Sequence, residues 1–365
     1  MFLFDFQLIR PPFETLQEDT LDWLACAHAK AEGKEAFRET IKERIWHVGC
    51  KPDRIAKRGH VLPDFLHQDW EKMELYRLTE EPSGKNLGAR MDIFQTEVEK
   101  VFDQYYPEEA TPPDDLIHVS CTGYVSPSGA QKIVSKRDWG AFTTVTHAYH
   151  MGCYGSIPAI RMGAGFLSHM SEKKRVDIVH TELCSLHTNP MLHASDQLVC
   201  QSLFADGFMK YSLSRTAPLP YLQIVNVREE IIPNSTEAMT WKVADWGFQM
   251  SLSKEVALLI TRHLPHYLGR LCSEKSPKQP LFAIHPGGPK ILTHIQKLLN
   301  LSEEQIRFSV QILKEYGNMS SATLPHIWER ILQDPSVEGG TPILSLAFGP
   351  GLSLCGILME KICGF

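Results

Sequence analysis

Three side chains suited to acyl transfer each lie beside glycine in the sequence. Cys153 stands in "GCYGS", His285 in "AIHPGGPKIL" and Asn318 in "YGNMSSAT". A cysteine nucleophile acts as a thiolate and needs a basic partner. An imidazole and an amide can donate hydrogen bonds to an oxygen that becomes negatively charged. Each residue alone would also suit a core or capping position, but the combination favours covalent catalysis through a thioester.

The setting of Cys153 predicts the N-terminus of a helix. Helical periodicity resumes near Gly155, and Pro158 suits the first turn because the N–H that it lacks would have no intrahelical partner. The helix dipole and the free backbone N–H groups at such a terminus stabilise a thiolate and can hold an oxyanion. We therefore expect Cys153 to be the most reactive thiol of the chain.

The two partner residues are expected at the ends of other elements. His285 follows the apolar run "LFAI", which is typical of a buried strand, and precedes "PGG". Asn318 follows Gly317, which can end a helix that begins with a capping box at Ser302 and Gln305. We expect His285 to form an ion pair with the Cys153 thiolate and to keep it deprotonated.

A zinc site is the alternative reading of the same segment. His147, His150 and Cys153 have spacings that would put them on one side of a helix. Gly152 and the small residues around it favour a turn at this point instead. We therefore predict no metal.

Strands and helices alternate along both halves of the chain, which predicts α/β layers with buried sheets. The run "TPILSLAFGPGLSLCGILM" is interrupted by Gly349-Pro350-Gly351, so it predicts two buried strands around a turn and no membrane span. The polar, tryptophan-rich residues 228–256 suggest an inserted hairpin. No short internal repeat is visible.

Composition narrows the functional class. The 365 residues suffice for two packed domains or one doubled domain, with 43% hydrophobic and 22% charged residues. The formal charge is −6 with both signs scattered, which argues against a nucleic-acid or anionic-membrane partner. Nine cysteines without a CxxC pair, and an N-terminus unlike a signal peptide, predict a cytoplasmic protein with reduced thiols.

Six motifs occur in an order and spacing that resemble the chalcone synthase family, the type III polyketide synthases of the thiolase superfamily. They are "GCYGSIPAIRMG", "QSLFADGF", "WGFQMSLSKEV", "IHPGGPKIL", "YGNMSSAT" and "FGPG", and their wording is closer to bacterial than to plant members. The resemblance covers the chain from about residue 40. It implies a thiolase-like doubled αβαβα layered fold with buried mixed sheets. Residues 1–222 would form the half that carries the cysteine, and residues 223–365 the half that carries His285 and Asn318.

The same resemblance implies roles for individual residues. Cys153 would carry the acyl group, while His285 and Asn318 would drive decarboxylation. Two gatekeeping phenylalanines and four further cavity residues are implied as well: Phe204 and Phe248, then Cys121, Leu186, Cys200 and Ser320. Arg44 and Lys51 lie near the positions that hold the coenzyme A phosphates, but they do not complete the family's three-residue pattern. This departure leaves acyl carrier protein as an alternative donor.

The resemblance implies a homodimeric acyltransferase without a cofactor. It would load an acyl starter on Cys153 and condense it with malonyl thioester to give a cyclised pyrone or resorcinol. Ser126 stands before Pro127 where plant members have methionine, which argues against a plant flavonoid product. The alternatives are a ketosynthase that joins two carrier-bound β-ketoacyl chains into an α-pyrone, a ketoacyl synthase of the third type, and a non-catalytic, acyl-binding partner subunit. A 3-hydroxy-3-methylglutaryl synthase is disfavoured because no glutamate falls in the motifs.

Overall fold

The computed structural model describes residues 1–272 and 279–364. Within these residues a nine-stranded mixed sheet runs through the molecule in the order β11-β12-β13-β8-β1-β7-β6-β4-β5. One wing consists of β1 (Phe2–Ile9), β4 (Asp115–Ser120), β5 (Thr144–Tyr149), β6 (Arg175–Leu183) and β7 (Asp206–Ser214). The other wing consists of β8 (Tyr221–Ile231), β11 (Leu281–Ile284), β12 (Pro342–Gly349) and β13 (Ser353–Ile362).

The two wings repeat one topology. β4 and β6 are parallel, and β6–β7 and β7–β1 are antiparallel; β11 and β12 are likewise parallel, and β12–β13 and β13–β8 antiparallel. The doubling is therefore confirmed at the level of topology, although the sequence shows no short repeat. The wings form one continuous sheet because Phe2 and Leu3 of β1 pair with Gln223 and Leu222 of β8. The boundary predicted after residue 222 falls inside β8.

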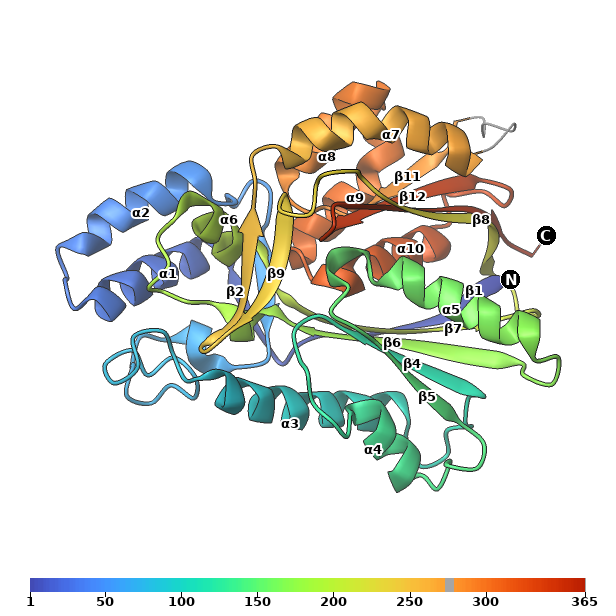
Figure 1. Ribbon diagram of the computed structural model, residues 1–365, viewed down its shortest axis with the longest axis horizontal. Coiled ribbons are helices and arrows are strands. Elements are labelled where there is room, and N and C mark those ends of the chain that lie inside the picture. The colour runs from blue at the N-terminus through green and yellow to red at the C-terminus, as the bar shows by residue number, and fades with distance from the viewer. Residues whose placement is uncertain (273–278, 365) are drawn as a thin grey trace.

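Helices and wings alternate in five layers across the described part of the chain (Figure 1). α7 (Val256–Cys272), α8 (Pro289–Leu299) and α9 (Glu303–Tyr316) cover the second wing, and α3 (Leu87–Tyr105) and α4 (Gly129–Lys136) cover the first. α5 (Ser156–His169) and α10 (Thr323–Gln333) lie between the wings, where Ile157, Ile160, Leu324 and Ile327 belong to one buried core cluster. The predicted αβαβα layering is confirmed.

The remaining elements flank the first wing. α1 (Gln17–Glu32), α2 (Phe37–Val48) and α6 (Ser195–Leu203) group together at the left of Figure 1. A small sheet pairs β2 (Phe13–Leu16) with β3 (Lys57–His60), and β9 (Met239–Ala244) pairs with β10 (Gly247–Leu252) as the predicted hairpin. Short 3₁₀ turns lie at η1 (Pro63–Leu66), η2 (Gly152–Tyr154), η3 (Cys184–His187) and η4 (Ser320–Ala322).

Several local predictions are confirmed. The Ser302 hydroxyl accepts from the Gln305 N–H, and the Gln305 side chain accepts from the Ser302 N–H, which completes the capping box of α9. Gly317 follows α9 at a φ of +76°. The apolar run near the C-terminus folds as the β12–β13 hairpin, with Gly349 opposite Ser353. In the part of the chain that is described, every helix is too short or too polar to cross a membrane.

Candidate active site

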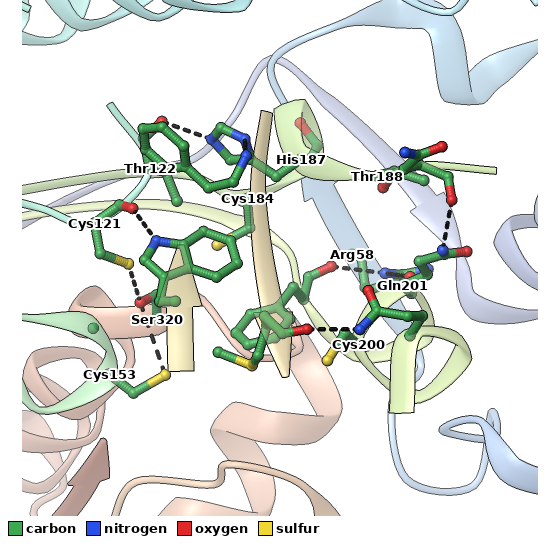
Figure 2. Close-up of a pocket in the computed structure, with 18 of the residues that line it drawn as sticks. Arg58, Cys121, Thr122, Cys153, Cys184, His187, Thr188, Cys200, Gln201 and Ser320 are labelled. Atoms are coloured by element: carbon green, nitrogen blue, oxygen red, sulfur yellow. Dashed lines mark hydrogen bonds between the residues drawn. The ribbon is translucent and has the colours of Figure 1, made fainter. Parts of the chain in front are cut away.

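A cavity of about 50 Å³ lies where the central helices begin (Figure 2). Cys121, Ser320 and Cys153 lie at one side of it, and Arg58, Cys200 and Gln201 at the other. Six of the predicted site residues line this cavity: Cys121, Cys153, Cys200, Phe204, Phe248 and Ser320. Folding thus gathers residues from both halves of the chain around one space.

Cys153 occupies the η2 turn that leads into α5, in agreement with the predicted helix start. Gly152 has a φ of +74°, and a Cβ built on it would lie 3.0 Å from Cδ of Pro350. Glycine is therefore required both by the backbone conformation and by the close approach of the β12–β13 turn. The thiol is buried, with 6% of the residue exposed.

Asn318 and Ser320 are fixed against Cys153 from the other half of the chain. The Ser320 N–H donates to Oδ1 of Asn318 over 2.8 Å, which orients the amide. Nδ2 of Asn318 is buried and has no hydrogen-bond partner among the described residues. The Ser320 hydroxyl lies 2.9 Å from Sγ of Cys121 and 3.8 Å from Sγ of Cys153. The turn at η4 thus presents an amide and a hydroxyl near the thiol.

His285 follows β11 as predicted, and its N–H donates to the Leu346 carbonyl over 2.7 Å. Because β11 and β12 are parallel, His285 lies at the end of the sheet where Gly349 and Pro350 pack against the η2 turn. The ring is 1% exposed, and both of its nitrogens lack a partner among the described residues. An imidazole with two unpaired nitrogens in a dry site is suited to accept and donate one proton in turn.

Burial favours the neutral forms of both groups. It raises the pKa of Cys153 to about 12, although the Ser320 hydroxyl and the Asn318 amide act in the opposite direction. It lowers the pKa of His285 to about 3. Burial thus acts against both charges of the expected thiolate–imidazolium pair, and that pair stays a prediction. Burial therefore favours a neutral Cys153 thiol and a neutral His285 imidazole, because neither charge is compensated in so dry a site.

Glu182 is a site residue that sequence reasoning missed. Its buried carboxylate ends β6 and accepts hydrogen bonds from the Cys121 N–H and the Thr122 hydroxyl, both over 3.0 Å, and from the Ser321 hydroxyl. Burial raises the pKa of Glu182 to about 7. The carboxyl group therefore ties the end of β4 to the η4 turn. The sequence signal that could have identified Glu182 is an acidic residue inside the buried strand "VDIVHTEL".

Leu186 is misplaced by the sequence prediction. It is 0% exposed and belongs to a core cluster with Phe94 and Val98, and it is not among the residues that line the cavity. The η3 turn instead presents Cys184 and His187 to the cavity, because its tight winding turns Leu186 into the core.

Arg44 and Lys51 are exposed and lie away from the cavity wall. Nη2 of Arg44 donates to the His193 carbonyl over 2.6 Å. Their role toward coenzyme A phosphates stays a prediction.

The residues of the zinc alternative are engaged elsewhere. Nε2 of His147 lies 2.8 Å from the Ser128 hydroxyl, and Nε2 of His150 lies 3.2 Å from the Trp241 carbonyl. Across residues 1–272 and 279–364, no group of three or more histidine, cysteine or acidic side chains is arranged to hold a metal ion.

The layered arrangement, with a buried cysteine at the start of a central helix, defines a thiolase-like fold. Residues 223–363 match the family described as chalcone and stilbene synthases, C-terminal domain. "Probable polyketide synthase 1" of Dictyostelium discoideum is 27% identical over 258 residues, which cover 68% of this chain. The chain spans only 8% of the length of that curated relative.

Solved structures of type III polyketide synthases share the fold. PKS-I from the brown alga Ectocarpus siliculosus superposes with a TM-score of 0.82 at 22% identity, covering 98% of this chain and 97% of that one. Tetrahydroxynaphthalene synthase from Streptomyces coelicolor A3(2) superposes with a TM-score of 0.82 at 22% identity, covering 100% of both chains. Residues 223–363 therefore match the chalcone and stilbene synthase family, and the chain as a whole shares the fold of these solved structures.

Proposed function

We propose that this chain is a condensing enzyme that loads an acyl starter on Cys153 and extends it with malonyl thioester. The observation that supports this most directly is the state of three buried groups. The Cys153 thiol adjoins the Asn318 amide, whose Nδ2 is unpaired, and His285 lies at the same end of the sheet with both ring nitrogens unpaired. Buried polar groups are rarely left without partners in a purely structural role.

Loading begins with proton transfer from Sγ of Cys153 to the neutral ring of His285. The thiolate attacks the carbonyl carbon of the donor thioester, and the oxygen of the tetrahedral intermediate is placed near the N-terminus of α5. The donor thiolate leaves and takes up the proton. Because burial disfavours both charges, we expect the ion pair to form only while the substrate is bound.

Extension uses the same groups in a second role. When a malonyl thioester loses carbon dioxide, the electron pair of the broken C–C bond forms an enolate. A ring N–H of His285 and Nδ2 of Asn318 are the donors for the enolate oxygen, and neither has another described partner to give up. The enolate carbon attacks the acyl carbonyl on Cys153, and the thiolate is released with the chain two carbons longer.

The narrower assignments rest on the family resemblance. We propose that the product is a cyclised pyrone or resorcinol, that no metal or redox cofactor takes part, and that the protein is a cytoplasmic homodimer. Coenzyme A thioesters and acyl carrier protein thioesters are both candidate donors. The intact set of Cys153, His285 and Asn318 supports an enzyme over an acyl-binding partner subunit.

Mass spectrometry of the intact protein tests the proposal. The protein is incubated with acetyl thioester alone and then with malonyl thioester, and the adduct is located by peptide mapping. We expect an acetyl adduct on Cys153 that is consumed when malonyl thioester is added, and products that His285→Ala and Asn318→Ala do not form. An adduct on another cysteine, or decarboxylation that is unchanged in both variants, would contradict the proposal.

A further inference from the structure

Three aromatic rings close the cavity on the side of the β9–β10 hairpin. His187 and Phe248 stack with ring centroids 4.5 Å apart and planes 5° apart. The Trp241 indole meets both rings edge-on, at 5.7 Å from His187 and 5.9 Å from Phe248. All three residues line the cavity, and we call them the aromatic cap. Neither Trp241 nor His187 was identified from the sequence motifs.

Hydrogen bonds fix the aromatic cap to the first wing. Nε1 of Trp241 donates to the Cys121 carbonyl over 2.6 Å. The Phe248 N–H donates to Nδ1 of His187 over 3.0 Å, and Nε2 of His187 lies 2.8 Å from the Thr122 carbonyl. Both nitrogens of His187 are thus used, which sets its tautomer: Nδ1 accepts and Nε2 donates.

The β9–β10 hairpin, which carries Trp241 and Phe248 of the aromatic cap, is held at further points. Nε2 of Gln197 donates to the Met250 carbonyl over 2.6 Å, and the Leu87 N–H donates to the Asp245 carbonyl over 2.9 Å. One bond comes from α6 and the other from the start of α3, so the hairpin is anchored to two separate elements. Moving it outward would break these bonds together with that of Trp241, so we treat the aromatic cap as a fixed wall.

The indole stands close to the reacting centre. Trp241 donates a hydrogen bond to the Cys121 carbonyl, and the thiol of Cys121 lies 2.9 Å from the Ser320 hydroxyl. That hydroxyl in turn lies 3.8 Å from Sγ of Cys153. The free volume of this cavity is about 50 Å³. An acyl chain that grows from Cys153 into this cavity therefore meets the aromatic cap, which forms part of its wall.

We propose that Trp241 is a specificity-determining residue that limits the length of the acyl group that Cys153 carries. This inference rests on the proposed function, because it concerns the acyl group that Cys153 carries. The indole excludes longer chains by volume, since a packed wall tolerates little overpacking. The hydrogen bond from the indole N–H to the Cys121 carbonyl holds the ring in the orientation that lines the cavity.

A chain-length series of acyl N-acetylcysteamine thioesters, from acetyl to dodecanoyl, tests the inference. The rate of adduct formation on Cys153 is followed by intact mass for the wild type, Trp241→Ala and Trp241→Phe. We expect the wild-type rate to fall about tenfold or more between acetyl and dodecanoyl, as overfilled apolar pockets discriminate on this scale. Trp241→Ala should load octanoyl within a few-fold of acetyl, and Trp241→Phe should lie between the two.

Val243→Ala is the matched control, because Val243 lies on the same strand, is 60% exposed and does not line the cavity. Its chain-length profile should equal that of the wild type. Circular dichroism establishes whether each variant folds. If Trp241→Ala does not fold, the comparison is made with Trp241→Phe alone. A wild type that loads dodecanoyl as fast as acetyl, or a folded Trp241 variant with an unchanged profile, overturns the inference. Failure of every donor to load Cys153 would overturn the proposed function instead.

Discussion

Asn318 and Phe204 pair through an isolated β-bridge that joins the two halves of the chain at the cavity. The Asn318 N–H donates to the Leu203 carbonyl over 3.0 Å, and the Ala205 N–H donates to the Asn318 carbonyl over 2.9 Å. The backbone of Asn318 is therefore held by the segment that presents Phe204, one of the two implied gatekeeping phenylalanines. A change in the backbone at either residue will disturb both.

Acyl thioesters and general alkylating agents should select different cysteines. Cys363 is partly exposed, whereas Cys153 is buried and its pKa is raised to about 12. In contrast to the order expected from the sequence, we expect iodoacetamide to modify Cys363 before Cys153, because Cys153 is buried. An acyl thioester should modify Cys153 alone, because only bound substrate provides the helix N-terminus with an oxyanion to stabilise. Peptide mapping of the wild type and of Cys363→Ser measures both. Acylation of Cys121 or Cys200 with retained activity would show that Cys153 is not the nucleophile.

Cys153→Gln should separate the two reactions. The glutamine amide can imitate the acyl-cysteine carbonyl but cannot carry a starter, so we expect malonyl decarboxylation to persist while condensation is lost. Carbon dioxide release and product formation are measured in parallel, with Cys153→Ala as the variant that lacks the amide. Loss of both reactions in a folded Cys153→Gln protein would contradict the assignment of decarboxylation to His285 and Asn318.

Glu182 should make the wild type less stable as pH rises. Its pKa is raised from 4.5 in the unfolded chain to about 7 in the folded protein, so the folded state binds the proton more tightly. The stabilisation is fully present below pH 4.5 and is lost as pH rises through 7, a change of about 3 kcal/mol in the free energy of unfolding.

Urea unfolding at several pH values gives the free energy of unfolding of the wild type and of Glu182→Gln. The loss appears as a change with pH in the difference between these two free energies. The exposed Glu108→Gln serves as control, and its difference from the wild type should not follow the same pH course. If the difference in free energy of unfolding between the wild type and Glu182→Gln does not change with pH, Glu182 has the same pKa in the folded and unfolded states.

Ser320→Ala should slow loading without affecting the fold. The hydroxyl lies 3.8 Å from Sγ of Cys153 and lowers the pKa of that thiol against the effect of burial. Loss of a hydrogen bond worth about 1 kcal/mol predicts a five- to tenfold slower acylation. Single-turnover acylation is compared with that of Ser212→Ala, a buried serine that bonds to Asp177 and does not line the cavity. Equal acylation rates for Ser320→Ala and Ser212→Ala would show that the Ser320 hydroxyl does not assist loading.

Cys200→Phe should restrict the products further. Cys200 lines the cavity on the side opposite Cys153, so the larger ring takes space from the growing chain (Figure 2). We expect fewer extensions or shorter starters, with acetyl loading of Cys153 little changed, when products from a set of acyl donors are compared by mass. Leu186→Ala should leave the product spectrum unchanged while costing about 2–5 kcal/mol of stability, because Leu186 lies in the core. An unchanged spectrum for Cys200→Phe would exclude Cys200 from the wall.

The sequence by itself determined the local setting of the three site residues. Glycine and proline restrict the backbone of their own neighbourhood, so the turn before α5, the strand end at His285 and the cap at Gly317 were all predictable. The same holds for the capping box of α9 and for the β12–β13 hairpin. The motif order also determined the αβαβα fold class through its resemblance to a family.

Only the tertiary structure decided which side chains share the cavity and in what charge state. His187 and Trp241, which line the cavity, and Glu182, which bonds to residues next to it, have no distinctive sequence neighbours. Hydrogen bonds to Phe248, Cys121 and Ser321 on distant segments place them. Leu186 turns away because of one tight turn in the middle of its segment. The pKa of a thiol depends on how completely water is excluded around it. That exclusion arises when both wings close over Cys153, so no local pattern in the sequence records it.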